Sequence, residues 1–254
     1  VPFTYIENCR LEDETFESGF FTFLRASRVV HALGNLKIAQ IGVRVDFFWT
    51  TIDNESELLE KFGVEVLPVD MADFIHNVLN RAEKNEKGYL TELRQMESWL
   101  DTSALKKPDG LVNSLAMRDE LFRLGEEESI SAFSIKSFSS IADNLGAGMG
   151  LCDLLVQERY PIAAESDIHG AVSSVLLEAA SNDTGPSFFP EFTMRHPEND
   201  NAVLLWHASA PLSLRHRDDQ TVSFRPPWIL KDLPDAYPQF RLQDGPLTVC
   251  RFDG

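Results

Sequence analysis

Apolar residues along this chain recur in two alternating patterns, and this alternation constrains the fold more than any other feature. Residues 17–33 and 54–62 have helical spacing, whereas residues 37–43 and 64–69 are short β-branched or apolar runs. Asn54 suits a helix N-cap, and Gly63 suits a helix end. A strand, a helix and a second strand in this order predict a parallel sheet covered by helices.

The same alternation continues through the middle of the chain. Further helical patterns occupy residues 72–84, 89–100, 111–124 and 168–180, and further strand patterns occupy residues 130–136 and 161–164. The predicted fold class is α/β, a Rossmann-like parallel sheet with helices on both faces, followed by part of a β-rich C-terminal domain. In such sheets ligands bind beyond the carboxyl ends of the strands.

The last part of the chain has a different character. Pro226, Pro227 and Pro234 interrupt any helix there, and residues 247–252 have a strand pattern. The sequence predicts a connecting segment and helix in residues 1–34, an α/β domain in residues 35–205, and the start of a β-rich domain in residues 206–254. We expect this last boundary to fall between about 190 and about 225.

The charge of the chain restricts its partners. Forty acidic and 23 basic residues give a formal net charge of −17, which repels nucleic-acid phosphates. No apolar stretch approaches the roughly 20 residues that cross a bilayer, and residues 1–7 lack the order of a signal peptide. Three distant cysteines, Cys9, Cys152 and Cys250, fit a reducing compartment. We expect a cytoplasmic protein that binds neither nucleic acid nor membranes.

Two glutamates and one histidine are the candidate site residues. Glu165, Glu191 and His207 each follow a short apolar run that reads as a strand, and residues at strand ends can converge on one point. Two carboxylates and one imidazole, completed by water or substrate oxygens, suit a hard divalent cation such as manganese or magnesium better than zinc or copper. The pattern therefore favours metal-assisted proton transfer.

Several residues also have plainer interpretations. A single glutamate in an acidic chain is usually solvated, and the local sequence of His207 favours a hydrogen-bonded core histidine. His169 and His196 have polar or loop-like surroundings that favour solvated side chains, so neither is placed in the metal set. The glycines of residues 146–150 follow a helical pattern, which favours a helix break over a nucleotide-binding loop. Lys136 ends a strand and could reach a sugar hydroxyl or simply lie at the sheet edge.

At these residues the chain resembles the L-fucose/L-arabinose isomerase family. Glu165-Ser166-Asp167-Ile168-His169-Gly170 is similar to the family's Glu-x-Asp-x-x-Gly segment, Phe189-Pro190-Glu191 to its apolar-x-acid segment, and Leu205-Trp206-His207 to the segment with its histidine ligand. Residues 25–30, 38–42 and 245–248 resemble parts of the middle and C-terminal domains of the family. The order and the approximate spacings also match.

This resemblance implies a metal-dependent aldose–ketose isomerase that acts on a monosaccharide through an enediol intermediate. It implies that Glu165 and Glu191 are both metal ligands and catalytic carboxylates, that His207 is the third ligand, and that the metal is a divalent ion, Mn²⁺ first. Asp167 lies two residues after Glu165, so we expect it to support a metal ligand or to contact a substrate hydroxyl rather than to bind the metal. The family also implies a homo-oligomer, a trimer or hexamer, and a chain that lacks an N-terminal domain and the end of the C-terminal one. Which glutamate handles which proton stays open.

Two other functions compete with this one. A catalytically silent sugar-binding or assembly domain could keep the isomerase fold without a complete pocket. A redox enzyme with a mononuclear iron is a third possibility, although such sites usually combine two histidines with one carboxylate rather than the reverse. Turnover of a sugar separates the first two functions, and metal exchange tests the third.

Overall fold

The computed structural model describes residues 3–105, 110–137, 140–146, 148–182, 185–225 and 237–253. Within these ranges the helices are α1 (Glu14–Gly34), α2 (Glu55–Phe62), α3 (Met71–Lys84), α4 (Glu86–Met96), α5 (Gly110–Glu127), α6 (Ser140–Leu145), α7 (Gly150–Val156) and α8 (Ile168–Ala180). The strands are β1 (Lys37–Ile41), β2 (Glu65–Val69), β3 (Leu100–Asp101), β4 (Ala132–Ile135), β5 (Ile162–Ala164), β6 (Glu191–Arg195), β7 (Val203–Trp206), β8 (Val222–Arg225) and β9 (Tyr237–Gln239). Two short 3₁₀ turns lie at Trp49–Thr51 and Leu212–Leu214.

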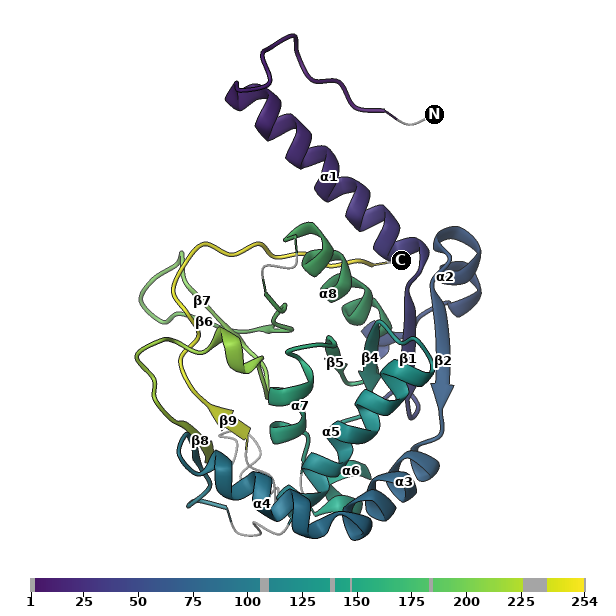
Figure 1. Ribbon diagram of the computed structural model, residues 1–254, viewed down its shortest axis with the longest axis vertical. Helices are drawn as coiled ribbons and strands as arrows, with labels where there is room; N and C mark the ends of the chain where they lie inside the picture. The colour runs from purple at the N-terminus through teal and green to yellow at the C-terminus, as the bar shows by residue number, and fades with distance from the viewer. Residues whose placement is uncertain are drawn as a thin grey trace.

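A four-stranded parallel sheet is the centre of the fold (Figure 1). Its strand order is β2-β1-β4-β5, and all three pairings are parallel. Each parallel pairing needs a connection that returns the chain to the same end of the sheet, and the helices between the strands provide it. The predicted α/β class with a Rossmann-like parallel sheet is confirmed.

Both faces of this sheet are covered by helices, because successive strand residues point to opposite sides. Ile38, Ala132 and Ala163 point into a core with apolar residues of α2 and α8. Ala39 and Phe133 point the other way, into a larger core with α3, α5 and α7. The carboxyl ends of β1, β4 and β5 therefore lie at the same edge of the sheet, between the two helical layers that cover its faces.

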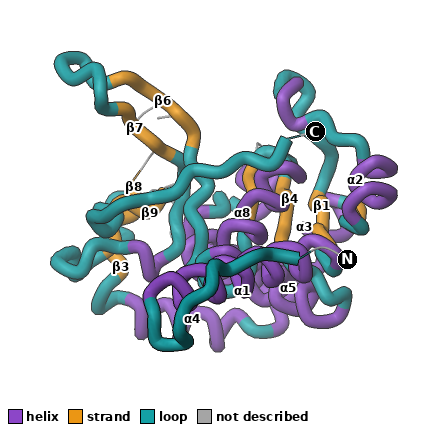
Figure 2. The backbone as a smooth tube through the Cα atoms, turned by 90° about the horizontal axis from the view of Figure 1, so that it is seen from above, coloured by secondary structure: helices purple, strands orange, loops and turns teal. Residues whose placement is uncertain are grey.

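Among the described residues, two further small sheets lie beside this body (Figure 2). β6 and β7 make an antiparallel hairpin, with Glu191 opposite Trp206. β3 pairs with β8 in parallel, and β8 pairs with β9 antiparallel. The hairpin ends at Trp206, next to the position at which the sequence predicts the start of a β-rich domain.

Most of the predicted elements are present where they were expected. α8 has the predicted bounds, and Asn54 accepts a hydrogen bond from Glu57 N at 3.2 Å as the N-cap of α2. Gly63 ends α2 with a left-handed φ of 73°, and Gly146 after α6 has φ 66°, so the expected helix break near residue 146 is confirmed.

Three expectations about elements are wrong. The helix predicted to reach residue 100 ends at Met96, because Leu100 pairs with Val222 in a sheet. The strand predicted for residues 247–252 is not one, because these residues extend along α8 without a sheet partner. β6 begins at Glu191 itself, so Glu191 does not follow a strand. The prolines at 226, 227 and 234 lie outside the described residues.

Candidate active site

Glu165 lies at the turn between β5 and α8, beyond the carboxyl end of the central sheet. The turn is unusual because Glu165 and Ser166 both have a left-handed backbone, with φ angles of 65° and 58°. Ser166 is fully buried, and its Oγ donates a hydrogen bond to Val43 O at 3.2 Å, after β1. Two consecutive left-handed residues that are not glycine cost free energy, and such turns are concentrated at functional sites.

Asp167 holds the start of α8. Its Oδ1 accepts a hydrogen bond from Gly170 N at 2.8 Å, which is the bond of an N-cap. Its Oδ2 forms an ion pair with the guanidinium of Arg251, and the residue is only 5% exposed. Both oxygens of Asp167 are therefore engaged by the protein.

The hairpin β6–β7 carries the other two candidates. Glu191 is an exposed residue at the start of β6, and His207 is a half-buried residue that directly follows β7. The ring of Phe189 lies between the hairpin and α8: its centroid is 5.4 Å from that of His207, and a methyl group built on Gly170 would overlap it. Phe189 thus joins the His207 side of the hairpin to the first turn of α8.

Glu191 is near enough to Glu165 to affect the charge of Glu165. Burial raises the pKa of Glu165 to about 7, and the negative charges of Glu191 and Asp167 add to this effect. Burial also lowers the pKa of His207 to about 4, although the residue as a whole is only half-buried. In the metal-free protein at neutral pH, His207 is therefore a neutral imidazole, the state in which it can bind a metal, and Glu165 is near half protonation.

The donor chemistry of this site suits a hard divalent metal, but the ligands are not gathered. Two carboxylates and a neutral imidazole are donors that Mn²⁺ accepts. In the described part of the chain, however, no three His, Cys, Asp or Glu side chains lie close enough together to hold a metal ion. The structure brings Glu165 and Glu191 within electrostatic range and leaves His207 beside Phe189.

Comparison with known proteins points to sugar isomerases. The chain is 28% identical over 191 residues to the sulfoquinovose isomerase of Alkalicoccus urumqiensis, which covers 74% of this chain and 42% of that protein. It is 25% identical over 210 residues to that of Clostridium sp. (strain MSTE9), and 22% identical over 213 residues to that of Priestia aryabhattai, with 82% of this chain covered in both cases. The chain spans less than half the length of these relatives. No family model matches it.

Sequence reasoning missed a second group of titratable residues beside the site, which consists of Asp53, His169 and Asp253. His169 is only 5% exposed, so the prediction of a solvated side chain is wrong; His196 is exposed, as predicted. Phe252 packs against the His169 ring, and Asp253 Oδ1 lies 3.5 Å from His169 Nδ1. Burial raises the pKa of Asp53, which the charge of His169 partly offsets. Only the contact between α8 and the distant C-terminal segment reveals this group.

All three cysteines are free, and Cys152 alone is buried. Within the described ranges, none of the helices is long and apolar enough to cross a membrane.

Proposed function

We propose that this chain is the part of a metal-dependent aldose–ketose isomerase that carries its catalytic carboxylates. The observation that supports this best is Glu165, a partly buried carboxyl with a pKa of about 7, held by a strained turn at the carboxyl end of a parallel sheet and near a second carboxylate. The names of the relatives support the reaction class independently. The proposed intermediate is an enediol.

The proposed metal is a divalent ion, Mn²⁺ first, held by Glu165, Glu191 and His207. Such an ion, when bound, polarises the sugar carbonyl and so makes the hydrogen on the neighbouring carbon more acidic. The proposal requires a local adjustment, because these side chains are not gathered among the described residues. The hairpin is the element that we expect to adjust: among the described residues its two strands pair only with each other, and most of their residues are exposed.

The two glutamates would divide the proton transfers. One removes the carbon-bound proton and returns it to the adjacent carbon, while the other carries the hydroxyl proton. In the metal-free protein Glu165 has a pKa of about 7, and metal binding would hold it in the ionised form, the form that accepts a proton from the sugar. Asp167 would accept a hydrogen bond from a sugar hydroxyl through a lone pair of its carboxylate oxygens that Gly170 N and Arg251 do not use. It also caps the start of α8.

The proposed substrate is a monosaccharide, and sulfoquinovose is the first to test because the relatives are named for it. That sugar carries a sulfonate, so its site needs a cation. Lys136 directly follows β4, whose last residue Ile135 pairs with Ala164, so Lys136 and Glu165 leave neighbouring strands side by side. Lys136 is partly exposed at this edge. We assign it as the candidate partner of the sulfonate.

Turnover by the full-length protein tests the proposal. We expect Mn²⁺-dependent isomerisation of sulfoquinovose, L-fucose or L-arabinose, and a loss of at least about a hundredfold in kcat for Glu165→Gln and for Glu191→Gln. Glu198→Gln, an exposed residue of the same hairpin, is the control. If both variants keep wild-type turnover, this mechanism is wrong. If wild type binds sugar without turning it over, the silent sugar-binding domain is the better description.

Metal binding is tested separately from turnover. His207→Ala should weaken Mn²⁺ binding, followed by electron paramagnetic resonance of the free ion, whereas His196→Ala should not, since that side chain is exposed. Lys136→Gln should raise KM for sulfoquinovose and leave KM for an uncharged sugar unchanged. An equal change for both sugars would remove Lys136 from the sulfonate site. The proposed assembly, a trimer or hexamer in the cytoplasm, needs a mass measurement on the same protein.

A further inference from the structure

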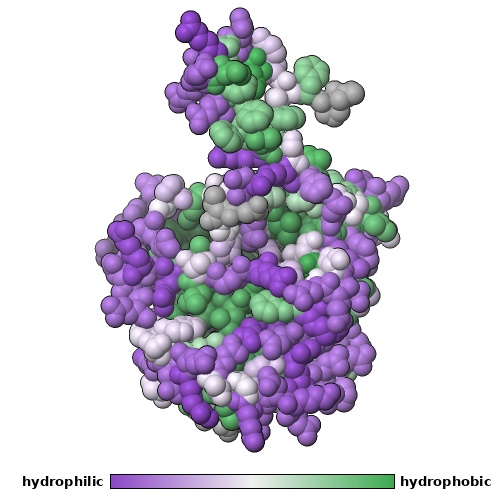
Figure 3. Space-filling model, in the orientation of Figure 1, coloured by the Kyte–Doolittle hydropathy of each residue, from purple (hydrophilic) through white to green (hydrophobic). Residues whose placement is uncertain are grey.

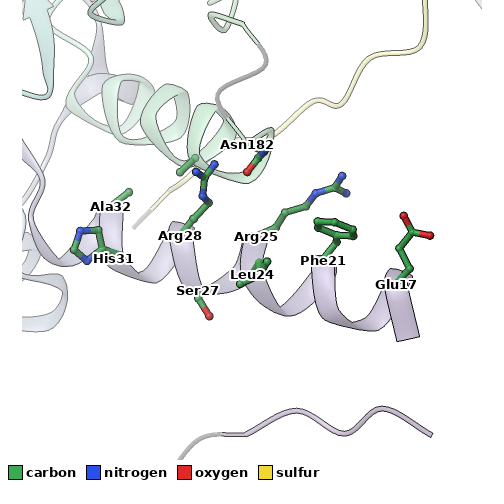
Figure 4. Close-up of a pocket in the computed structure, with 10 residues that line it drawn as sticks. Glu17, Phe21, Leu24, Arg25, Ser27, Arg28, His31, Ala32 and Asn182 are labelled. Atoms are coloured by element: carbon green, nitrogen blue, oxygen red, sulfur yellow. The ribbon is translucent and has the colours of Figure 1, made fainter. Parts of the chain in front are cut away.

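Helix α8 is held in different ways at its two ends. Near its last turn lies α1, whose apolar side chains stay exposed (Figure 3), and Ala179 and Asn182 border a groove there (Figure 4). Its first two turns follow Glu165 and are contacted by residues 251–253, which come 79 to 84 positions later in the sequence than the residues they touch. A distant segment therefore lies against the start of the helix that carries the candidate active site.

Phe252 anchors this segment. Its backbone N donates a hydrogen bond to Ser173 Oγ at 2.8 Å. Its ring packs against the rings of His169 in α8 and Phe62 in α2, with centroid distances of 5.7 Å and 5.3 Å. Contacts with two separate helices fix the position of Phe252, and so the place from which the preceding Arg251 reaches α8.

Arg251 pairs with the residue that caps α8. Its Nη1 contacts Oδ2 of Asp167, whose Oδ1 accepts the hydrogen bond from Gly170 N at 2.8 Å. Asp167 is 5% exposed, so without Arg251 it would be a nearly buried carboxylate that has lost the cation paired with it. Removal of one partner from a buried pair is strongly destabilising. Arg251 therefore lets Asp167 stay ionised in its capping position.

The turn that Asp167 closes is strained and needs support on both sides. Glu165 and Ser166 both have left-handed backbones, and such residues persist only when the surrounding structure holds them. On the sheet side, Ser166 N donates a hydrogen bond to Ile135 O at 3.1 Å. On the helix side the turn continues directly into Asp167, which is held by the cap and the ion pair. A shift of Asp167 would let the turn relax and would move the Glu165 carboxyl.

We propose that Arg251 is a positioning residue that holds the Glu165 carboxyl in its catalytic place by fixing Asp167. This inference rests on the proposed isomerase function, because that function gives Glu165 its catalytic role. Arg251 itself touches neither sugar nor metal in this assignment. A displacement of about 1 Å at a catalytic group can lower the rate about a hundredfold, so the loss of such support is measurable in kcat.

Turnover of the full-length protein with saturating Mn²⁺ and sugar measures this effect. Arg251→Ala should lower kcat at least about tenfold. Arg251→Lys should restore most of the loss, because one nitrogen, Nη1, makes the contact and a guanidinium fork is not needed for it. Arg241→Ala is the control and should turn over sugar like wild type, because it removes an ion pair to Asp219 rather than one to the cap of α8.

Amide hydrogen exchange tests the support of the turn without the need for turnover. In Arg251→Ala, peptides that cover residues 164–172 should exchange at least about tenfold faster, while peptides from β4 should change little, since a global loss of stability would affect both. Asp167→Asn added to Arg251→Ala should restore slow exchange, because the amide oxygen still caps α8 and needs no cation.

The two measurements separate this inference from the proposed function. If wild type turns over no sugar, the proposed function fails, and faster exchange in Arg251→Ala still supports the hold of Arg251 on the turn. Unchanged exchange at residues 164–172 in Arg251→Ala, or equally fast exchange in Arg241→Ala, overturns the proposal. Faster exchange with a wild-type kcat also overturns it, as does a KM that rises for sulfoquinovose alone, which would make Arg251 a ligand of the sulfonate.

Discussion

Replacing Glu165 with Gln should stabilise the metal-free protein at and above neutral pH, because it removes a carboxylate that is costly to ionise. The pKa of Glu165 rises from its ordinary value of 4.5 to about 7, first through burial and then through the charges of Glu191 and Asp167. The native state therefore holds this proton more tightly than the unfolded state does. It follows that the wild-type free energy of unfolding falls as the pH rises from about 4.5 to about 7.

The size of this effect follows from the displacement of the pKa. At about 1.4 kcal/mol for each pH unit, a carboxyl moved from 4.5 to about 7 loses on the order of 3 kcal/mol once it is fully ionised. Glu165 keeps some contact with solvent, which screens its charge and reduces the expected loss to about 2 kcal/mol. Gln has the same shape and no charge, so the variant escapes this loss.

Urea unfolding at about pH 4.5, 6 and 8 measures the difference, with chelator present to keep the protein free of metal. The stability of Glu165→Gln relative to wild type should be near zero at the lowest pH and should grow to about 2 kcal/mol at the highest. Glu60→Gln, on the exposed side of α2, should show no such trend. A difference between Glu165→Gln and wild type that is the same at all three pH values would refute the reasoning.

Two further substitutions test how the site is supported. Asp167→Ala removes both an N-cap and the ion pair to Arg251, so it should lower the free energy of unfolding by about 2 kcal/mol. Asp70→Ala removes only the exposed N-cap of α3 and should lower it by about 1 kcal/mol. Equal losses in thermal unfolding would show that the ion pair does not contribute. Gly170→Ala forces the Phe189 ring to move and should lower the free energy of unfolding by about 1–3 kcal/mol. Gly34 has open space around it, so Gly34→Ala should change stability by no more than about 0.5 kcal/mol. A neutral Gly170→Ala would show that Phe189 is free to shift.

Local sequence patterns predicted the central layer of the fold because its signals are local. The apolar runs of β1, β4 and β5 and the helical spacing of α8 depend on neighbours within a few positions, so the order of elements and the place of Glu165 after β5 could be foreseen. The short α7 was missed, since the glycines before it resemble a loop. The burial of His169 and the absence of a strand at residues 247–252 depend on contacts between segments about 80 positions apart, such as Phe252 N donating to Ser173 Oγ at 2.8 Å.

The candidate site shows the same division between local and distant signals. Glu165 could be placed from its own surroundings, but its raised pKa depends first on burial in the folded protein and then on the charge of Glu191, which lies on a separate hairpin. The ion pair between Asp167 and Arg251 also joins residues distant in sequence. The periodicity of the sequence contains no information about contacts between residues that are distant in the chain. That Glu165, Glu191 and His207 share a metal stays a prediction.

The left-handed turn at Glu165 and Ser166 limits which mutations this position tolerates. In a saturation library selected for folding alone, Gly should be enriched at Ser166, because it relieves a φ of 58°, and Val, Ile and Thr should be lost. At Glu165, selection for folding should likewise favour Gly or Asn, whereas selection for activity should restore Glu. The two selections then favour different residues at position 165, so we expect the conflict between stability and function to be concentrated in the Glu165-Ser166 dipeptide.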